Sequence, residues 1–143
     1  MDSLDYTGRS PASYRIRMRE PEEVTTIVCH QMGVGVWRED NPMFAKTRAH
    51  FVAQQSGRVI KNHDPLWRLR YGSGVLNHCC ITLECAGNYE TSRGVWWKPE
   101  KMGRDRLAEH PKQVASVREL VAQLCEDYPS ITTITGHRAI SRG

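Results

Sequence analysis

Two short runs of β-branched residues, near opposite ends of the chain, each finish in a histidine. The first covers residues 24–29 and is followed by His30; the second covers residues 131–135 and is followed by Gly136 and His137. β-Branched side chains fit a pleated, half-buried surface, so each run predicts a buried strand. Two such strands side by side in one sheet would bring both imidazoles to one point.

The pattern between these runs predicts a hairpin, a central strand and one long helix. Short runs at 50–55 and 58–61 flank Ser56-Gly57, which is typical of a β-hairpin. Residues 79–85 form the most apolar strand, which we place at the centre of the sheet. Residues 111–128 begin with a proline suited to a first helical turn. Apolar residues recur there at helical spacing: Val114, Val117, Leu120, Val121, Leu124 and Cys125.

The remaining segments connect these elements into one domain over residues 1–143. Residues 1–22 are polar and predict an extended lead-in, with an edge strand around 14–18. Asn41-Pro42 predicts the start of a short helix that runs to about residue 47. Residues 62–78 predict a long loop, of the kind that often carries function. The order of elements predicts an α/β (α+β) fold, with a mixed sheet of about five to six strands flanked by helices.

Composition and charge are those of an ordinary globular protein. The 143 residues are 39% hydrophobic and 25% charged, with a formal net charge of +4. No basic run is interleaved with aromatic residues, so we expect no nucleic-acid partner. We find no apolar stretch of the roughly 18 residues that a membrane span needs and no signal peptide, so we expect a cytoplasmic protein without a membrane partner. The sequence does not determine the oligomeric state, and a monomer is our expectation.

The five cysteines argue against a disulfide framework. Their number is odd, two of them are adjacent, and no paired CxxC motif occurs. Free thiols in a reducing compartment are the expected state. A structural zinc knuckle is excluded on the same grounds.

His30, Glu84 and His137 each lie at or near the end of a predicted core strand. Alternation along the central strand puts Glu84 on the face opposite Leu83. Burying a carboxylate there is costly unless it has a partner. Two neutral imidazoles for zinc, an open position for water and a carboxylate for the proton make up a metallohydrolase site. From the residues alone, hydrogen-bonded structural histidines and a salt-bridged glutamate remain an equal alternative.

Four segments occur in the order found in the zinc N-acetylmuramoyl-L-alanine amidases. They are Ile27-Val28-Cys29-His30, Ala49-His50-Phe51-Val52 followed by Ser56-Gly57-Arg58-Val59, Ile81-Thr82-Leu83-Glu84-Cys85-Ala86-Gly87, and Thr135-Gly136-His137-Arg138-Ala139-Ile140-Ser141. The chain resembles this family over roughly residues 24–141. The helix ending at Tyr128-Pro129, before the strand that leads to His137, is most similar to the AmpD-type branch.

The resemblance implies a fold and an activity. The fold is that shared by these amidases and the peptidoglycan recognition proteins. The activity is zinc-dependent hydrolysis of the amide bond between N-acetylmuramic acid and L-alanine, in peptidoglycan or muropeptides. A phage endolysin, which reaches the cell wall by a route other than a signal peptide, and a bacterial enzyme both fit this description.

Site residues follow from the resemblance position by position. His30 and His137 match the family's two zinc histidines, and Glu84 matches the catalytic glutamate of the AmpD-type branch. The phage and recognition-protein branch has a tyrosine where this chain has Ala49, as AmpD-type enzymes do. Glu84 is therefore expected to carry the proton. His50 has a counterpart that is not a ligand, which implies a structural role.

One part of the family's site has no counterpart in the sequence. The third zinc ligand, an Asp or a Cys, and an accompanying Lys would lie at positions beyond Gly143. We expect the C-terminal end of the domain to be missing, with weak or absent metal binding in the chain that ends at Gly143. The alternative is a non-catalytic peptidoglycan-binding module of the same fold with an incomplete metal site.

Aromatic and basic residues near the predicted site are candidates for substrate binding. Trp37 and Trp67 lie in predicted loops and could line a peptide groove, although core packing is an equal alternative for each. Lys46, Arg48 and Arg70 could hold a stem-peptide carboxylate, since a cation is what that ligand needs. A solvated surface position remains the alternative for each of them.

A cysteine hydrolase is the least favoured hypothesis. It would use Cys79 or Cys80 together with His78. Cys29 lies next to a proposed ligand but faces the other way, so we expect it in the core. His63 lies in a predicted loop and is expected to be solvated.

Overall fold

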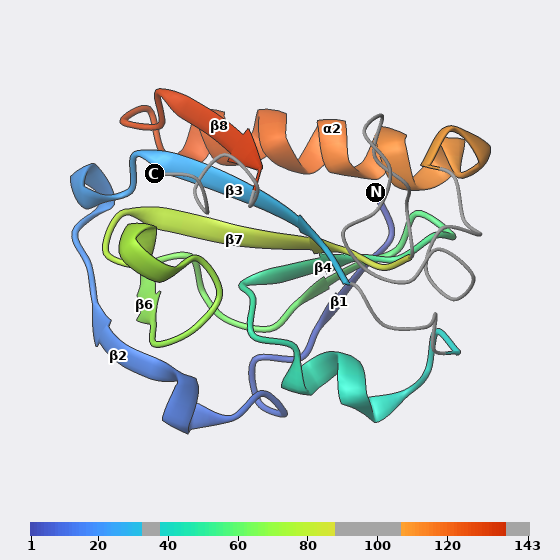
Figure 1. Cartoon of the computed structure of the whole chain (residues 1–143), viewed down its shortest axis with the longest axis horizontal. Helices are drawn as coiled ribbons and strands as arrows, with labels where there is room; N and C mark the ends of the chain where they lie inside the picture. The colour runs from blue at the N-terminus through green and yellow to red at the C-terminus, as the bar shows by residue number, and fades with distance from the viewer. Residues whose placement is uncertain (33–37, 88–106, 137–143) are drawn as a thin grey trace.

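The computed structural model describes residues 1–32, 38–87 and 107–136, and its centre is a six-stranded mixed sheet (Figure 1). The strand order is β1-β5-β4-β7-β3-β8. The strands are β1 (Ser3–Asp5), β3 (Thr26–Gln31), β4 (Phe51–Ala53), β5 (Val59–Lys61), β7 (Cys80–Cys85) and β8 (Thr133–Gly136). All neighbours are parallel except β4 and β5, which form the predicted hairpin. The predicted fold class and the central position of β7 are confirmed.

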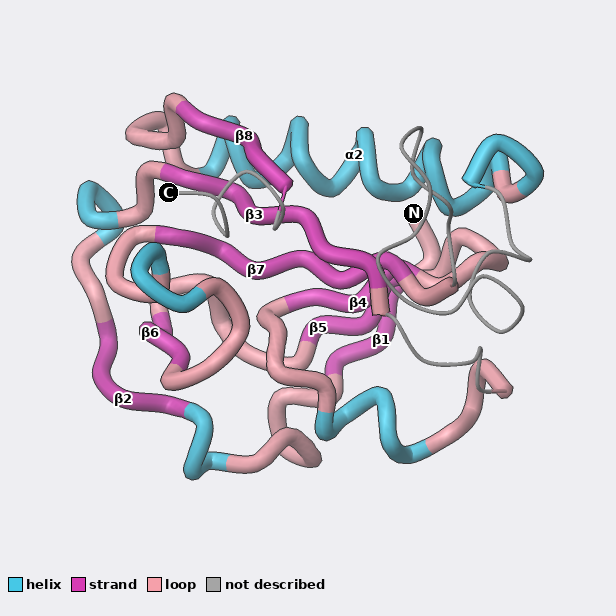
Figure 2. The backbone as a smooth tube through the Cα atoms, in the orientation of Figure 1, coloured by secondary structure: helices cyan, strands magenta, loops and turns pink. Residues whose placement is uncertain are grey.

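One face of the sheet packs against the helix α2 (Pro111–Asp127), which Figure 2 shows running alongside β8 and β3. Ile27, Ile81 and Leu83 from the sheet form a buried cluster with Leu120 and Leu124 from the helix. The periodicity of the sequence predicted this helix, and its bounds are confirmed to within one residue. Among the described residues, no helix has the length and hydropathy of a membrane span.

The opposite face carries a second, smaller core. Phe44 comes from the 3₁₀ helix η3 (Pro42–Lys46) and packs near Val52 and Ile60 of the sheet. The side chain of Asn41 accepts a hydrogen bond from the backbone N–H of Met43, as the predicted N-cap requires. The further 3₁₀ helices are η1 (Ala12–Tyr14), η2 (Pro21–Glu23), η4 (Gly74–Leu76) and η5 (Leu107–Glu109).

Residues 1–22, predicted as an extended lead-in, and residues 62–78, predicted as a long loop, both contain short strands. Residues 1–22 are more than a lead-in, because β1 extends the sheet by parallel pairing with β5. The predicted edge strand is β2 (Arg15–Met18), which pairs with β6 (Trp67–Leu69) in a separate two-stranded sheet. Both β1 and β6 have only three residues, too few for a hydrophobic period to show.

The strand that leads to His137 is not buried as its β-branched residues predicted. Among the described strands, β8 lies at the edge of the sheet and pairs with β3 alone, with Gly136 opposite Cys29 at the end of the register. Ile134 is 55% exposed. An edge strand needs β-branched residues for its pairing as a central strand does, so its composition does not distinguish the two positions.

Candidate active site

The ends of β3 and β7 place His30 and Glu84 side by side. The two residues are partners in the parallel register of these strands. Both lie on the sheet face that points away from α2, because the alternate residues of the same strands, such as Ile27 and Leu83, pack in the helix-side core. The two strands, adjacent in Figure 1, therefore hold an imidazole and a carboxyl at one edge of the sheet.

His30 and Glu84 line one cleft of about 420 Å³. Its remaining described lining residues are Arg48, Arg70, Tyr71, Gly72, Gly74 and Asn77. The cleft thus lies between the carboxyl ends of parallel strands and the segment of residues 70–77. Ligand sites in α/β sheets are commonly found at such strand ends.

Glu84 is partly buried, and one of its carboxyl oxygens is out of contact with solvent. Its Oε2 atom has no hydrogen-bond partner among the described residues. Burial raises the pKa of Glu84 from 4.5 to about 8, so the metal-free site holds a neutral carboxylic acid at pH 7. A buried carboxyl with an unused oxygen beside an imidazole is a donor set that suits a divalent cation or a proton-transfer reaction.

His30 is 7% exposed, and its Nε2 atom lies 3.2 Å from the hydroxyl oxygen of Ser73. Ser73 is itself 3% exposed and lies 2.9 Å from the hydroxyl of Thr82 on β7. Sequence reasoning missed Ser73, which stands in a glycine-rich segment without a recognisable motif. The Gly-Ser-Gly sequence at 72–74 was its only signal, since glycines often allow close backbone approach.

Two arginines line the open side of the cleft. Arg70, a candidate for substrate binding from the sequence, is exposed and belongs to the lining. Arg48 lines it too, with its guanidinium 4.4 Å from the ring centre of Tyr71 and 5.9 Å from that of Tyr14. Stacking on two rings holds this cation in place. The cleft therefore presents positive charge to an anionic ligand.

A sequence model of the family described as N-acetylmuramoyl-L-alanine amidase matches residues 20–143. The chain belongs to this amidase family. The match covers all the strands and helices from η2 onward, including those that hold His30 and Glu84. A comparison with curated protein sequences gives no match.

Solved structures of amidases and of peptidoglycan recognition proteins share the fold. The Ph2119 endolysin from a Thermus scotoductus bacteriophage has a TM-score of 0.65 at 20% identity, covering 99% of this chain and 88% of that one. The amidase LysC from Clostridium intestinale URNW has a TM-score of 0.64 at 15% identity, with 98% and 85% covered. A complex of tracheal cytotoxin with the ectodomains of peptidoglycan recognition proteins LCa and LCx has a TM-score of 0.66 at 14% identity, with 100% and 88% covered.

Four predicted site residues of this amidase domain are not among the described residues that line the cleft. His137 and Trp37 are outside the described residues. Lys46 and Trp67 do not belong to the described lining of the His30–Glu84 cleft. Lys46 is exposed at the end of η3. Trp67 lines a different cleft of about 360 Å³ and lies beneath the guanidinium of Arg15, because β6 pairs with β2 instead of forming part of a loop.

The sequence placed His50 correctly and His63 wrongly. His50 is buried; its Nδ1 accepts the backbone N–H of Thr82 at 3.0 Å, and its Nε2 donates to the Trp67 carbonyl at 2.7 Å. Burial lowers the pKa of His50 to about 3, so the ring is a neutral structural cross-link. His63 is fully buried rather than solvated, and burial lowers its pKa to about 4. The side chain of Arg15 donates to its Nδ1 at 3.1 Å, a contact across 48 residues that local pattern cannot reveal.

The thiols do not form a nucleophilic site with His78. Cys79 donates to the Leu76 carbonyl, and the His78 ring bonds the Val75 carbonyl at 3.0 Å. Cys80 is buried, and its desolvation raises the pKa of the thiol, which disfavours the reactive thiolate. Cys29 packs against the helix-side core as expected.

Proposed function

We propose that the chain is a zinc-dependent N-acetylmuramoyl-L-alanine amidase of the AmpD type. It would hydrolyse the amide bond between the lactyl carbonyl of N-acetylmuramic acid and the L-alanine of the stem peptide. The observation that carries the proposal is the pairing of His30 with Glu84 in one cleft, where the Oε2 atom of Glu84 is buried and has no partner among the described residues. Membership of the amidase family supports the choice of reaction.

His30 and His137 would hold the zinc ion. The β3/β8 register ends with Cys29 opposite Gly136, and the next residue of each segment is one of these histidines. The parallel pairing that ends at Gly136 supports a shared ligand position for the two histidines that follow in sequence. In the described ranges no three His, Cys, Asp or Glu side chains gather as a metal site, so the proposed set draws on residues outside them. When bound, zinc would supply Lewis acidity toward the water and the scissile carbonyl.

Glu84 would move the proton. Burial raises the pKa of Glu84 and so favours the neutral carboxyl, whereas a nearby cation would favour the charged carboxylate. As a carboxylate, Glu84 accepts the proton of the attacking water and then returns it to the amine of the leaving L-alanine. Ala49 is fully buried and has no polar group, so the alternative tyrosine at this position is absent and Glu84 alone takes the role.

Arg48 and Arg70 would bind the stem peptide. They are the two cations that line the cleft within the described part of the chain, and stem peptides carry carboxylates. Trp37 remains a proposed groove residue, and Lys46 and Trp67 are less suitable because neither belongs to the described lining of the cleft.

The test compares the longest chain that the gene encodes with its Glu84→Gln variant on a purified muropeptide. Wild type should release free stem peptide, measured by chromatography with mass detection, and the variant should lose at least about a hundredfold in rate, the scale of general acid–base catalysis. Bound zinc, measured by elemental analysis, should be equal in the two proteins. Glu126→Gln, on the exposed side of α2, is the matched control and should retain full activity. Equal turnover by the Glu84 variant would contradict the assignment.

A non-catalytic peptidoglycan-binding module is the second candidate. Peptidoglycan recognition proteins match the fold with TM-scores similar to those of the endolysins, so the fold alone does not separate the two functions. This candidate predicts sedimentation with purified peptidoglycan but neither release of stem peptide nor bound zinc.

A further inference from the structure

We infer that Ser73 is a positioning residue for His30. A chain of buried hydrogen bonds from His30 through Ser73 and Thr82 to Cys80 fixes the imidazole tautomer, with the proton on Nε2 and the lone pair on Nδ1. The consequence for metal binding rests on the proposed function. The hydrogen-bond chain itself can be tested without a metal.

The four side chains form a continuous path on the cleft side of the sheet. The His30 Nε2 atom lies 3.2 Å from Ser73 Oγ, which lies 2.9 Å from Thr82 Oγ1. Thr82 Oγ1 lies 3.7 Å from the Cys80 sulfur, within hydrogen-bond range for a thiol. Exposure falls from 7% at His30 to 3% at Ser73 and 1% at Thr82 and Cys80. Solvent therefore does not compete for these groups.

The direction of the hydrogen bonds decides whether His30 can be a ligand. The Ser73 hydroxyl lies at the Nε2 side of the ring, so His30 would bind a cation through Nδ1. Nδ1 has a lone pair only when the proton is on Nε2, and Ser73 Oγ must then accept that proton. In that arrangement the hydroxyl of Ser73 would donate to Thr82, and that of Thr82 to the Cys80 sulfur. The protons of His30, Ser73 and Thr82 then each have an acceptor.

Backbone contacts hold Ser73 against the sheet. Its N–H donates to the side-chain oxygen of Asn77 at 2.8 Å. Gly72, at φ +122°, lets the chain pass close to Thr82; a Cβ atom there would lie 2.8 Å from the Arg48 carbonyl oxygen and 3.1 Å from Thr82 Oγ1. Neither contact would leave space for a side chain. The backbone of residues 72–73 is thus held where the Ser73 hydroxyl reaches both His30 and Thr82.

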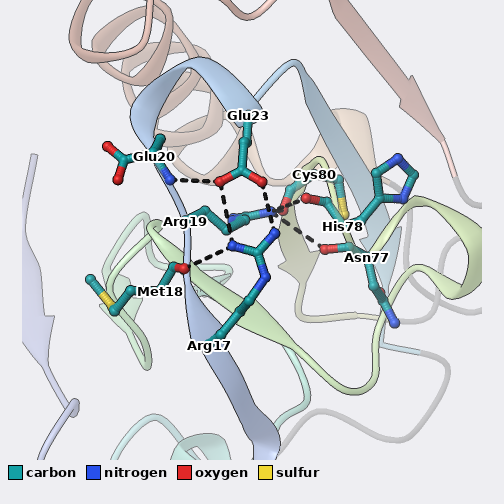
Figure 3. Close-up of polar contacts among 8 residues, drawn as sticks. All are labelled: Arg17, Met18, Arg19, Glu20, Glu23, Asn77, His78 and Cys80. Atoms are coloured by element: carbon teal, nitrogen blue, oxygen red, sulfur yellow. Dashed lines mark hydrogen bonds and ion pairs between the residues drawn. The ribbon is translucent and has the colours of Figure 1, made fainter.

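Arg19 anchors the other end of this segment, as Figure 3 shows. Its guanidinium is buried and donates to the carbonyls of Asn77, His78 and Cys80, at 3.4, 3.4 and 3.0 Å. It also donates to the Pro65 carbonyl. One side chain therefore ties Asn77, which holds Ser73, to the first residue of β7.

Hydrogen-bond partners of metal-binding histidines typically contribute 10- to 100-fold to metal affinity.

The first experiment measures zinc affinity by chelator competition in the longest chain that the gene encodes. Ser73→Ala should weaken binding by about tenfold or more. Thr82→Val, which keeps the shape but removes the acceptor of the Ser73 proton, should weaken it by a smaller factor. Ser116→Ala is the matched control: Ser116 is also buried, at 7% exposure, and donates to the Gly57 carbonyl from α2, on the far face of the sheet. The control should bind zinc as wild type does. A Ser73→Ala protein that is folded and binds zinc within about twofold of wild type would overturn the inference while leaving the amidase function intact.

The second experiment reads the tautomer directly in the metal-free wild-type chain. Imidazole ¹⁵N chemical shifts of His30, at a pH where the ring is neutral, should show the proton on Nε2. That signal should shift or be lost to solvent exchange in Ser73→Ala. A proton on Nδ1 in wild type would contradict the inference, whether or not any variant folds. If wild type neither binds zinc nor cleaves muropeptide, the proposed function fails, and the ¹⁵N shifts alone decide the hydrogen-bond chain.

Discussion

His30 on β3 and Glu84 on β7 are partners in a parallel register, so their spacing is set by the sheet and not by a loop. Neighbouring strands lie about 4.8 Å apart, which brings the two side chains to the same cleft without any special turn. Sites built on strands are held more rigidly than sites built on loops. The arrangement has a cost, because the carboxyl of Glu84 is buried with no hydrogen-bond partner for Oε2 among the described residues.

Glu84→Gln should stabilise the metal-free protein. Burial raises the pKa of Glu84 from 4.5 to about 8, so the folded state holds a proton that the unfolded state releases between these pH values. Stability of wild type therefore falls as the pH rises through this window. At pH 7 the variant should be more stable by roughly 2–3 kcal/mol, measured by urea unfolding in the presence of a chelator.

The difference between the two proteins should close as the pH is lowered toward 4.5. There the unfolded state begins to bind the same proton, and the advantage of glutamine disappears. A constant difference between pH 8 and pH 5 would show that the Glu84 carboxyl is ionised in the fold.

His50 should lower the stability of the folded protein as the pH falls, whereas Glu84 lowers it as the pH rises. Burial lowers the pKa of His50 from 6.5 to about 3, so below pH 6.5 the unfolded state binds a proton that the folded state excludes. Stability that depends on His50 is present above pH 6.5 and declines as the pH falls. From pH 7 to pH 5 this decline is about 2 kcal/mol.

His50→Gln isolates this contribution from that of Glu84. Glutamine can still donate to the Trp67 carbonyl but does not titrate. The variant should start less stable than wild type, and the difference should shrink by the same 2 kcal/mol between pH 7 and pH 5. Parallel stability curves for the two proteins would mean that His50 is protonated in the fold.

The elements with clear periodicity followed from the sequence. The helix at Pro111–Asp127 and the central strand Cys80–Cys85 have enough apolar residues to show their period. β1 (Ser3–Asp5) has three residues and exists because it pairs with β5, a contact across more than 50 positions. The exposure of Ile134 depends on the edge position of β8, which is a property of the sheet order and not of the local residues.

The site residues also divide into those that local pattern predicts and those that depend on contacts distant in sequence. His30 and Glu84 were predicted because each lies near the end of a strongly patterned strand, and their register then follows from parallel pairing. Ser73 was missed because its role comes from a fold of the chain that brings it against Thr82. The burial of His63 was missed for a similar reason, since its partner Arg15 is distant in sequence.

Gly72→Ala should destabilise the protein by about 3 kcal/mol, measured by urea unfolding. Its φ of +122° disfavours any side chain, and the new Cβ would lie 2.8 Å from the carbonyl oxygen of Arg48. Gly74→Ala is the matched control, because Gly74 also has a positive φ (+55°) but a Cβ there meets no atom within 4 Å. The control should cost about 1 kcal/mol. Equal effects would indicate that the close contact at Gly72 relaxes without cost.

Arg19→Met should destabilise the protein by about 3 kcal/mol, measured by urea unfolding at pH 7. The guanidinium is 4% exposed and donates to four carbonyls, from Pro65, Asn77, His78 and Cys80. Burial lowers the pKa of Arg19, because desolvation disfavours the charged guanidinium. Methionine fills much of the same volume and removes that buried charge. It also leaves the four carbonyls without their donor. Arg17→Met is the control two residues away, since Arg17 is exposed and pairs with Glu23 at 2.7 Å on the surface (Figure 3). It should change stability little, because solvent screens exposed ion pairs. If the Arg19 variant were as stable as the Arg17 variant, the buried guanidinium would not be what holds residues 77–80 to the segment at Pro65.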